Sequence, residues 1–325
     1  MKNVLVTGAN GFVGRSLIRL LHKEGFHVRA AARKPSLESL QDDFPVTDRV
    51  TLDLDGRENN YEQLLEGMDA VVHLAARVHR GDEDANDLGI YRKTNVDGTR
   101  LLAEQAARQG VKRFVFLSSI KVNGDSTTYE RDDNYRKFRE EDPVAPRGSY
   151  AVSKLESEHA LQAVCRKSGM ESVILRPPLV YGPGVKANFL QLLKAVEKGY
   201  PLPFASVNNL RSLLYVENLS SGILACLRHS KAANQLFLIS DVDTSVPVLI
   251  QAIASALGRR ALLLPCPVSM LKITGILTGR YAAIERLTQS LVIDSSRIKR
   301  MLQWTPACTL KEGMAATAEW YRKRP

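Results

Sequence analysis

The chain contains few cysteines, and their spacing argues against a disulfide framework or a cysteine-bound metal. Only four occur in 325 residues, and no two of them form a CxxC pair. Such usage is typical of reduced thiols, so we expect a cytoplasmic protein. The strand pattern begins at once, with no basic and apolar leader before it, which favours the same compartment. The four residues are Cys165, Cys226, Cys266 and Cys308.

Long hydrophobic runs are absent as well. The most apolar stretch, residues 261–277, is interrupted by Pro265, Pro267 and Lys272 and falls short of the roughly 20 residues of a membrane span. We therefore expect no integral membrane segment. Residues 268–278 favour a buried or groove-lining helix, and an interfacial membrane helix is the alternative.

Acidic residues are outnumbered by basic ones, 35 against 45, which gives a net charge of +10. Such an excess is compatible with nucleic acid, an anionic membrane or small anionic ligands. The basic residues are dispersed, however, and do not form a stripe with aromatic residues. We therefore expect no nucleic acid partner. A pair of phosphate-rich small ligands explains the charge better.

The sequence does contain a regular alternation of short apolar strands and amphipathic helices. Such alternation predicts an α/β fold with a Rossmann-type, doubly wound parallel sheet covered by helices on both faces. In these sheets the ligand lies beyond the carboxyl ends of the strands. Expected strands cover residues 3–7, 28–32, 50–52, 70–74, 114–117 and 173–175, and expected long helices cover residues 90–109 and 149–167.

The alternation loosens from about Pro177, where prolines and glycines cluster. We interpret residues 1–176 as a dinucleotide-binding domain, with a return to it around 211–240. Residues 177–325 then form mainly a smaller substrate-binding lobe. The segment 125–142 is dense in charge and poor in apolar residues, which predicts a mobile loop.

The first residues, MKNVLVTGANGFVG, place three glycines between a strand pattern and a helix pattern. Gly8, Gly11 and Gly14 let phosphates approach the backbone and let helix and strand pack closely. The helix that follows presents unpaired N–H groups and the positive end of its dipole. This order of elements predicts a pyrophosphate site.

Tyr150 and Lys154 stand four residues apart, on one face of an expected helix. A free tyrosine has a pKa near 10 and is a poor acid–base catalyst at neutral pH. We expect the lysine ammonium, aided by a nicotinamide ring, to lower that pKa. Ser118 and Ser119 end a strand at the same edge of the sheet, where a hydroxyl could hold a substrate oxygen.

These patterns together resemble the extended short-chain dehydrogenase/reductases, and best of all their sugar-nucleotide epimerase/dehydratase branch. The resemblance covers essentially the whole chain. It implies that Tyr150 is the acid/base, that Lys154 holds the nicotinamide ribose, and that Ser119 is the catalytic hydroxyl. The motifs are TGANGFVG (7–14), Asp53-Leu54, LAA (74–76), LSS (117–119), YAVSK (150–154), RPPLVYGPG (176–184) and RSLLYVENL (211–219).

The resemblance also implies the residues that surround the cofactor. Asp53 would meet the adenine, and Asn95 would lie near the ribose or support strand packing. The full expected set is Gly8, Asn10, Gly11, Phe12, Val13, Gly14, Arg33, Asp53, Leu54, Leu74, Ala75, Ala76, Asn95, Tyr150, Lys154 and Pro177.

Arg33 decides between the two nicotinamide cofactors. In NAD-specific members an acidic residue closes the second strand and accepts bonds from the ribose hydroxyls. Here Ala32 takes that place and is followed by Arg33 and Lys34. Two cations without a carboxylate favour a 2′-phosphate, so we expect NADP(H) to be preferred, with NAD(H) as the alternative.

For the substrate, the resemblance places Asn188 and Arg211 on the diphosphate of a nucleotide sugar. An arginine suits a bidentate clamp on its oxygens. A second clamp could come from Arg286 or Arg280. His73 and His79 look like a pair, but no carboxylate spacing completes a metal site, so we expect no metal and a structural His73.

We therefore expect an NADPH-dependent oxidoreductase acting at C4 of a nucleotide sugar, which reduces a UDP-4-keto-6-deoxy-N-acetylhexosamine for surface polysaccharide synthesis. A UDP-hexose or UDP-N-acetylhexosamine 4-epimerase is the nearest alternative. A reductase of non-sugar ketones and a non-catalytic dinucleotide sensor are further alternatives. The two long helices resemble the pair through which family members dimerise, so we expect a homodimer with Leu155 and Leu161 facing outward.

Overall fold

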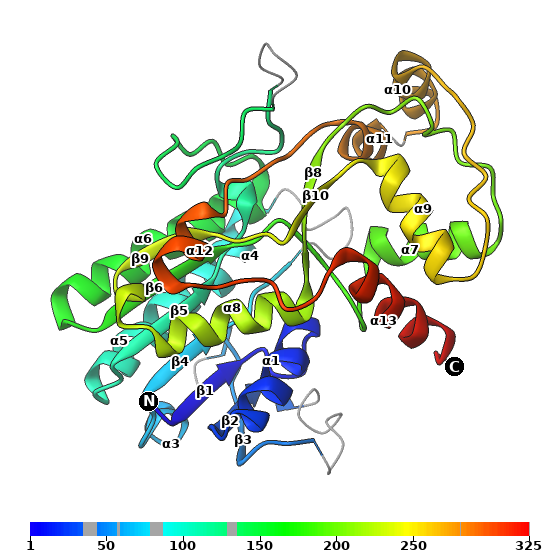
Figure 1. Cartoon of the computed structure of the whole chain (residues 1–325). Helices are drawn as coiled ribbons and strands as arrows, with labels where there is room; N and C mark the ends of the chain where they lie inside the picture. Colours follow the sequence, from blue (N-terminus) through cyan, green and yellow to red (C-terminus); the bar gives the residue numbers. More distant parts are fainter. Residues whose placement is uncertain (35–43, 57–58, 79–86, 129–134, 280, 325) are drawn as a thin grey trace.

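A seven-stranded parallel sheet forms the centre of the molecule (Figure 1). The computed structural model describes residues 1–34, 44–56, 59–78, 87–128, 135–279 and 281–324. The strand order is β3-β2-β1-β4-β5-β6-β9, so the direction of the strand sequence reverses between β1 and β4. The fold class predicted from the alternation is confirmed. The strands are β1 (Asn3–Thr7), β2 (His27–Ala32), β3 (Asp48–Thr51), β4 (Ala70–His73), β5 (Arg113–Leu117), β6 (Glu171–Arg176) and β9 (Gln235–Leu238).

Helices cover both faces of this sheet, because alternate strand residues point to opposite sides and are apolar on both. One face packs against α1 (Phe12–Lys23), α8 (Val216–Arg228) and α12 (Ser296–Leu302). The other face packs against α3 (Tyr61–Leu65), α5 (Gly98–Arg108) and α6 (Gly148–Ser168). Two 3-10 turns, Ile120–Val122 and Ser230–Ala232, lie in the connections.

The helix expected over residues 90–109 is continuous but not uniform. It begins as α4 (Leu88–Tyr91), passes through a π-helical segment (Arg92–Asp97) and ends as α5. A π segment holds one residue more per turn than an α-helix, so it re-aims the side chains that follow it. Asn95 lies in this segment and is buried.

Leu161 does not face outward, contrary to expectation. It is fully buried in the core between α6 and the sheet, whereas Leu155 is half-buried. The expectation failed because small polar residues also occupy the buried side of α6. Ser157, for example, is fully buried and donates a hydrogen bond to the main-chain oxygen of Asn95 (2.9 Å).

A second, smaller sheet lies beyond the carboxyl edge of the first. Strand β8 (Arg211–Tyr215) pairs in parallel with β7 (Leu179–Tyr181) and antiparallel with β10 (Val242–Thr244). Its core is shared with α7 (Ala187–Glu197), α9 (Val246–Ala256) and α13 (Leu310–Arg322). At the far end of this lobe stand α10 (Val268–Leu277) and α11 (Tyr281–Thr288) (Figure 1).

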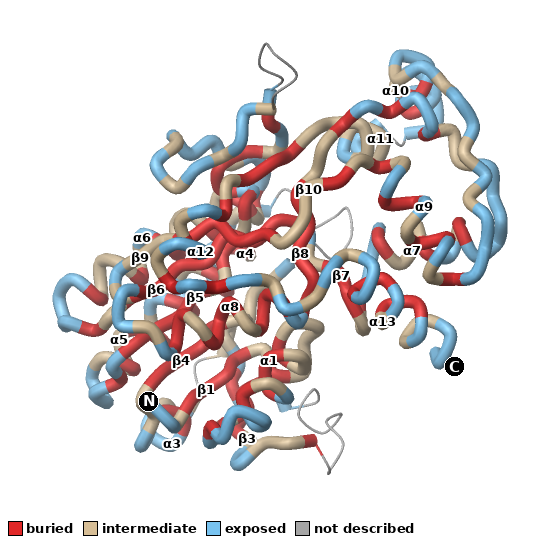
Figure 2. The backbone as a smooth tube through the Cα atoms, viewed as in Figure 1, coloured by how far each residue is buried: buried red, intermediate tan, exposed pale blue. Residues whose placement is uncertain are grey.

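Helix α10 forms where residues 268–278 predict a helix, but most of its residues are not buried. Only Leu271 and Gly275 of its ten residues are buried, and the rest of its surface is partly or fully exposed (Figure 2). The reason is that α11 covers α10 from one side. A Cβ atom on Gly275 would lie 3.1 Å from the Cα atom of Tyr281. In the described part of the chain, no helix has the length and apolarity needed to cross a membrane.

A buried polar cluster joins β1, β4 and α5 beneath the carboxyl edge of the sheet. The hydroxyl oxygen of Thr7 lies 2.7 Å from Nδ1 of His73 and accepts hydrogen bonds from the main-chain nitrogens of Leu74 and Ala75 (both 3.2 Å). Nε2 of His73 lies 3.1 Å from the hydroxyl of Thr99. Burial lowers the pKa of His73 to about 3, so the imidazole is neutral.

Candidate active site

The glycine loop lies between β1 and α1, at the point where the strand order reverses. Gly8 has a φ of +68°, and a Cβ atom there would lie 2.9 Å from the main-chain nitrogen of Ala75. A Cβ atom on Gly14 would lie 2.3 Å from the carbonyl oxygen of Gly8. Both positions therefore require glycine. They allow the loop to pack tightly between the end of β4 and the first turn of α1.

The first turn of α1 suits a diphosphate. Its N-cap residue is Gly11, which supplies no side-chain hydrogen bond, and the turn contains no acidic residue. The N–H groups there have no side-chain acceptor, and the helix dipole adds positive potential. Phe12 and Val13 begin this turn, and Asn10 directly precedes its N-cap, so the chain's own residues fit a dinucleotide.

The other expected cofactor residues meet at this edge of the sheet. Leu74, Ala75 and Ala76 follow β4 beside the glycine loop. Pro177 follows β6, and its carbonyl oxygen accepts a hydrogen bond from the main chain of Ile120 (3.0 Å). Asp53 and Leu54 follow β3.

The end of β2, where the resemblance places the adenosine of a cofactor, is basic. Ala32 closes the strand, and Arg33 and Lys34 after it are both exposed. Asp53 is also exposed, at the end of the neighbouring β3, and accepts a hydrogen bond from the main chain of Asp55 (3.2 Å). The first positions after β2 thus offer a phosphate two cations and no carboxylate.

Asn95 carries out the packing role, one of the two that the resemblance implies. Its side-chain oxygen accepts from the main-chain nitrogen of Arg77 (2.7 Å). Its amide donates to the carbonyl oxygen of Arg77 (3.1 Å) and to the hydroxyl of Ser153 (3.0 Å). Asn95 therefore ties the segment after β4 to α6, within which Tyr150 and Lys154 lie.

Ser119 and Tyr150 are brought together by β5 and α6. Ser119 follows β5, and Tyr150 lies in the first turn of α6. Burial raises the pKa of Tyr150 to about 12, and the nearby Ser119 side chain acts against this rise. Among the chain's own residues burial dominates, and the lowering expected from Lys154 together with a nicotinamide ring stays a prediction. At neutral pH the phenol is protonated.

Lys154 lies one turn further along α6 and is only 2% exposed. Its ammonium donates a hydrogen bond to the carbonyl oxygen of Leu117 (2.7 Å) and stands 4.3 Å from the ring centre of Phe116. Burial lowers the pKa of Lys154 to about 7, and the carboxylate of Glu158 acts in the opposite direction. The lysine can therefore gain or lose a proton near neutral pH.

A buried ion pair behind these residues was not anticipated. Glu158 of α6 contacts Arg176 of β6 through two hydrogen bonds (2.5 and 2.9 Å), and both side chains are less than 5% exposed. Ser118 donates to Glu158, and Arg176 donates to Asn123 (2.9 Å). The one sequence signal was that Glu158 follows Lys154 by four residues, on the same face of the helix. The network holds β5, β6 and α6 together at the candidate site.

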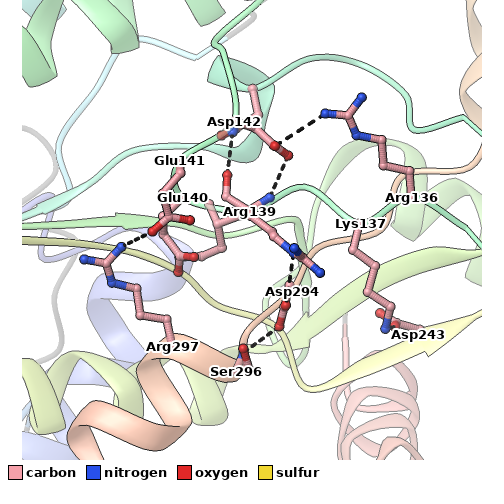
Figure 3. Close-up of polar contacts among 12 residues, drawn as sticks. Arg136, Lys137, Arg139, Glu140, Glu141, Asp142, Asp243, Asp294, Ser296 and Arg297 are labelled. Atoms are coloured by element: carbon pink, nitrogen blue, oxygen red, sulfur yellow. Dashed lines mark hydrogen bonds and ion pairs between the residues drawn. The ribbon is translucent and has the colours of Figure 1, made fainter.

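In its described part, the connection from Ser119 to Tyr150, where a mobile loop is expected over 125–142, contacts other segments of the chain. Residues 129–134 lie outside the described residues. Three ion pairs join residues 137–141 to segments distant in sequence: Lys137–Asp243 (2.9 Å), Arg139–Asp294 (3.6 Å) and Glu141–Arg297 (2.6 Å) (Figure 3). The charges that suggested a solvated loop instead bind partners that are distant in sequence.

The expected substrate residues lie in the second lobe. Arg211 begins β8, and its Nη1 donates to the carbonyl oxygens of Arg286 (2.7 Å) and Gln289 (3.0 Å). Burial and the nearby Arg286 guanidinium lower the pKa of Arg211. Asn188 is exposed in the first turn of α7, and Arg286 is exposed on α11. Arg280 lies outside the described residues.

His73 is structural, as predicted, because both ring nitrogens contact threonine hydroxyls. His79 lies outside the described residues. Within the ranges that the structure describes, no group of three or more His, Cys, Asp or Glu side chains could hold a metal ion.

Known proteins are similar to this chain in sequence and architecture. Residues 4–240 match the model of the NAD dependent epimerase/dehydratase family. A UDP-glucose 4-epimerase of Vibrio cholerae is 42% identical over 98% of this chain and 95% of its own. The N-acetyl-α-D-glucosaminyl-diphospho-ditrans,octacis-undecaprenol 4-epimerase of Escherichia coli O157:H7 is 28% identical over 98% of this chain and 95% of its own. The structure of a UDP-glucuronic acid 4-epimerase from Bacillus cereus with NAD shows the same fold, with a TM-score of 0.77 at 22% identity over 99% of both chains.

Proposed function

Because the chain belongs to the NAD-dependent epimerase/dehydratase family, we propose that it is an oxidoreductase that acts at C4 of a nucleotide sugar. Its favoured reaction is the NADPH-dependent reduction of a UDP-4-keto-6-deoxy-N-acetylhexosamine for surface polysaccharide synthesis. The observation that carries this proposal is the position of the Tyr150 phenol, which is protonated at neutral pH and close enough to Ser119 for that side chain to influence its pKa. A phenol that holds its proton at neutral pH is suited to give it to a ketone oxygen.

The roles of the side chains follow from their positions. NADPH, when bound, supplies the hydride that reduces C4. Tyr150 donates its proton to the oxygen on C4, and the Ser119 hydroxyl holds that oxygen against the phenol. Lys154 lies four residues after Tyr150 on the same face of α6, and its pKa of about 7 allows it to donate a proton near neutral pH. Lys154 would hold the nicotinamide ribose and would return a proton to the phenol after the reduction.

Arg33 and Lys34 support NADP(H) over NAD(H). Both are exposed directly after β2, where an acidic residue would be needed to accept bonds from the ribose hydroxyls. Two cations pair with a 2′-phosphate instead. NADPH that binds in its reduced form and leaves in its oxidised form would fit a net reduction of the substrate.

Arg211 and Arg286 support a diphosphate on the substrate. Burial of Arg211 beside a second guanidinium creates a positive site that an anion would stabilise. The 4-epimerases of Vibrio cholerae and Escherichia coli to which the chain is similar are both named for a sugar joined to a diphosphate. An apolar ketone carries no negative charge that could pair with such a site. The four free cysteines support a cytoplasmic location.

A 4-epimerase acting on a UDP-hexose or UDP-N-acetylhexosamine is the second candidate. It is favoured by the 42% identity to a protein named UDP-glucose 4-epimerase. The same Ser119, Tyr150 and Lys154 would serve an oxidation followed by a reduction. Net consumption of reduced cofactor distinguishes the two reactions.

The test supplies each candidate substrate with its cofactor. A reductase consumes NADPH in proportion to the 4-keto sugar nucleotide and forms one reduced sugar. An epimerase interconverts UDP-N-acetylglucosamine and UDP-N-acetylgalactosamine, or the hexose pair, without net change in cofactor. Tyr150→Phe must abolish the observed reaction. Epimerisation without NADPH consumption replaces the reductase proposal by its rival, and inactivity on both substrate classes refutes C4 chemistry on nucleotide sugars.

A further inference from the structure

Glu158 of α6 holds a carboxylate in the interior of the molecule, directly behind the candidate active site. The side chains of Glu158 and Arg176 are only 2% and 4% exposed. The carboxylate accepts hydrogen bonds from Nη2 of Arg176 (2.5 Å), from Nε of Arg176 (2.9 Å) and from the hydroxyl of Ser118. A buried ion pair often stabilises a fold no more than apolar residues of similar volume would. The stability of the fold alone therefore does not account for this pair.

The pair fixes the segment that carries Ser119. Ser118 directly precedes Ser119, and its hydroxyl donates to the carboxylate of Glu158. Arg176 donates to the side-chain oxygen of Asn123 (2.9 Å), four residues beyond Ser119. The chain is therefore bound to the ion pair on both sides of Ser119.

The pair also acts on Lys154, which precedes Glu158 by one turn on the same face of α6. The ammonium of Lys154 donates to the carbonyl oxygen of Leu117, and Glu158 accepts from the hydroxyl of the next residue, Ser118. The ammonium and the carboxylate therefore bind neighbouring residues at one strand end. Burial lowers the pKa of Lys154 to about 7, and the negative charge of Glu158 opposes this lowering.

His73 of β4 and Tyr150 of α6 are further titratable groups around the Lys154 ammonium. Both are neutral at pH 7, because burial lowers the pKa of His73 to about 3 and raises that of Tyr150 to about 12. Arg176 of β6 is a cation, which by itself would oppose a charge on Lys154. The carboxylate of Glu158 is therefore the group among these whose charge favours the ammonium.

We propose that Glu158 is a positioning residue for the reaction proposed above, which stabilises the ammonium form of Lys154 and fixes the strand end that carries Ser119. Its carboxylate is enclosed and hydrogen-bonded at both oxygens, so Glu158 acts through these two side chains. Arg176 holds the carboxylate in place. The inference rests on the proposed function, because it concerns the proton that Lys154 returns to Tyr150.

Titration of Lys154 in the unliganded chain tests the inference. Lysine labelled with ¹³C at Cε reports its protonation state by NMR, and the signal that Lys154→Arg removes belongs to this residue. Glu158→Gln keeps the size of the side chain but removes its charge, so the pKa of Lys154 should fall by about one unit or more. Glu156→Gln is the matched control. It removes a partly exposed carboxylate of the same helix, paired with Arg92 (2.6 Å), and should leave the pKa of Lys154 unchanged.

A second variant guards against misfolding, because Glu158→Gln leaves the cation of Arg176 buried without its partner. Glu158→Gln combined with Arg176→Gln removes both charges. The pKa of Lys154 should fall in this variant too, since the carboxylate is the charge that acts on Lys154 in the intact pair. The fall should be smaller than in Glu158→Gln, where the unpaired cation adds to it.

The pH dependence of turnover is the second readout. Return of the proton requires the ammonium form of Lys154, so kcat should fall as the pH rises through the pKa of Lys154. In Glu158→Gln this fall should begin at a pH lower by about one unit or more. A purely structural role would instead lower kcat by the same factor at every pH.

An unchanged pKa of Lys154 in both variants overturns the inference. A lowered pKa with an unshifted pH profile of kcat overturns it as well, because Glu158 would then not act on the reaction. Absence of any reaction on nucleotide sugars refutes the proposed function, whereas the NMR titration needs no substrate and still decides whether Glu158 acts on Lys154.

Discussion

The ammonium nitrogen of Lys154 lies 2.7 Å from the carbonyl oxygen of Leu117. Leu117 ends β5 two residues before Ser119, and Lys154 follows Tyr150 by one turn of α6. This one hydrogen bond therefore ties the strand that carries the serine to the helix that carries the tyrosine. A charge-assisted bond of this kind is stronger than a neutral one, which suits a contact that sets the geometry of a site.

Tyr150→Phe should lower turnover by roughly 10²- to 10⁴-fold, because only the transferable proton is lost. Cofactor affinity should stay within a few-fold, since the ring still packs against Tyr91. Tyr200→Phe, which removes an exposed hydroxyl, is the control and should be fully active. More than a tenth of the activity left in Tyr150→Phe would remove this residue from the mechanism.

Arg33→Asp should move the preference from NADPH toward NADH by about tenfold or more, because a phosphate partner becomes an acceptor for ribose hydroxyls. The ratio of kcat/KM for the two cofactors is the measurement. Arg108→Asp makes the same charge change at an exposed position at the end of α5 and should leave the ratio unchanged. An unchanged ratio in Arg33→Asp would mean that Arg33 does not bind the 2′-phosphate of NADPH.

Arg211→Ala should weaken binding of the sugar nucleotide and of free UDP by roughly 30- to 1,000-fold, because charge-assisted bonds in a partly desolvated site are lost. NADPH affinity should change little. Arg211→Lys should recover only part of the loss, since an ammonium cannot form the bidentate fork.

Arg211 also bonds the carbonyl oxygens at the end of α11, so its loss has a structural component. Thermal melting of the same variants separates the two effects. If Arg211→Ala melts early while its folded fraction binds UDP as the unmodified chain does, the residue supports the fold and does not hold the diphosphate.

Acid should destabilise the protein through His73. The folded-state pKa is about 3, and an unfolded histidine titrates near 6.5. The unfolded chain therefore binds a proton that the folded chain does not bind. The free energy of unfolding falls as the pH drops below about 6.5. Between pH 7 and pH 5 the loss from this group is about 2 kcal/mol.

Urea unfolding across that range measures the loss. His73→Gln is less stable at pH 7 because two contacts change, but its stability should fall less steeply toward pH 5. His27→Gln, at an exposed position, should follow the unmodified chain. A slope unchanged in His73→Gln would show that other groups govern the acid transition.

We propose a homodimer formed through α5 and α6, the two helices that lie side by side on one face of the sheet. Leu101 and Leu155 are the half-buried leucines there. Leu101→Glu combined with Leu155→Glu should dissociate the dimer in light scattering at micromolar concentration. A monomeric unmodified chain, or a dimer that survives both substitutions, would exclude this interface.

The sheet could be predicted from the sequence because its strands are short apolar runs between turn residues. Each of the strands β1 to β6 extends within about two residues of its expected range, and β9 lies within the expected return of the chain around 211–240. The positions of the glycine loop and of Ser119 and Tyr150 could be predicted from the same strand pattern. Strand ends of a parallel sheet meet at one edge, so residues directly after strands could be assigned to one site.

What could not be predicted depends on contacts between residues far apart in sequence. The ion pair of Glu158 with Arg176 joins a helix to a strand, and nothing in either segment indicates that both charges are buried. The partners of Lys137, Arg139 and Glu141 lie more than 100 residues further along the chain. The exposure of α10 depends on α11 covering only one of its two apolar sides.

The hydroxyl of Thr7 determines where the single ring proton of His73 resides. This oxygen already accepts two main-chain N–H groups, so its own hydrogen points to Nδ1. The imidazole must then carry its proton on Nε2 and donate it to Thr99. With the tautomer fixed and both nitrogens engaged, the ring offers no lone pair to a metal or a substrate. It acts as a neutral spacer that holds β1, β4 and α5 at fixed separation.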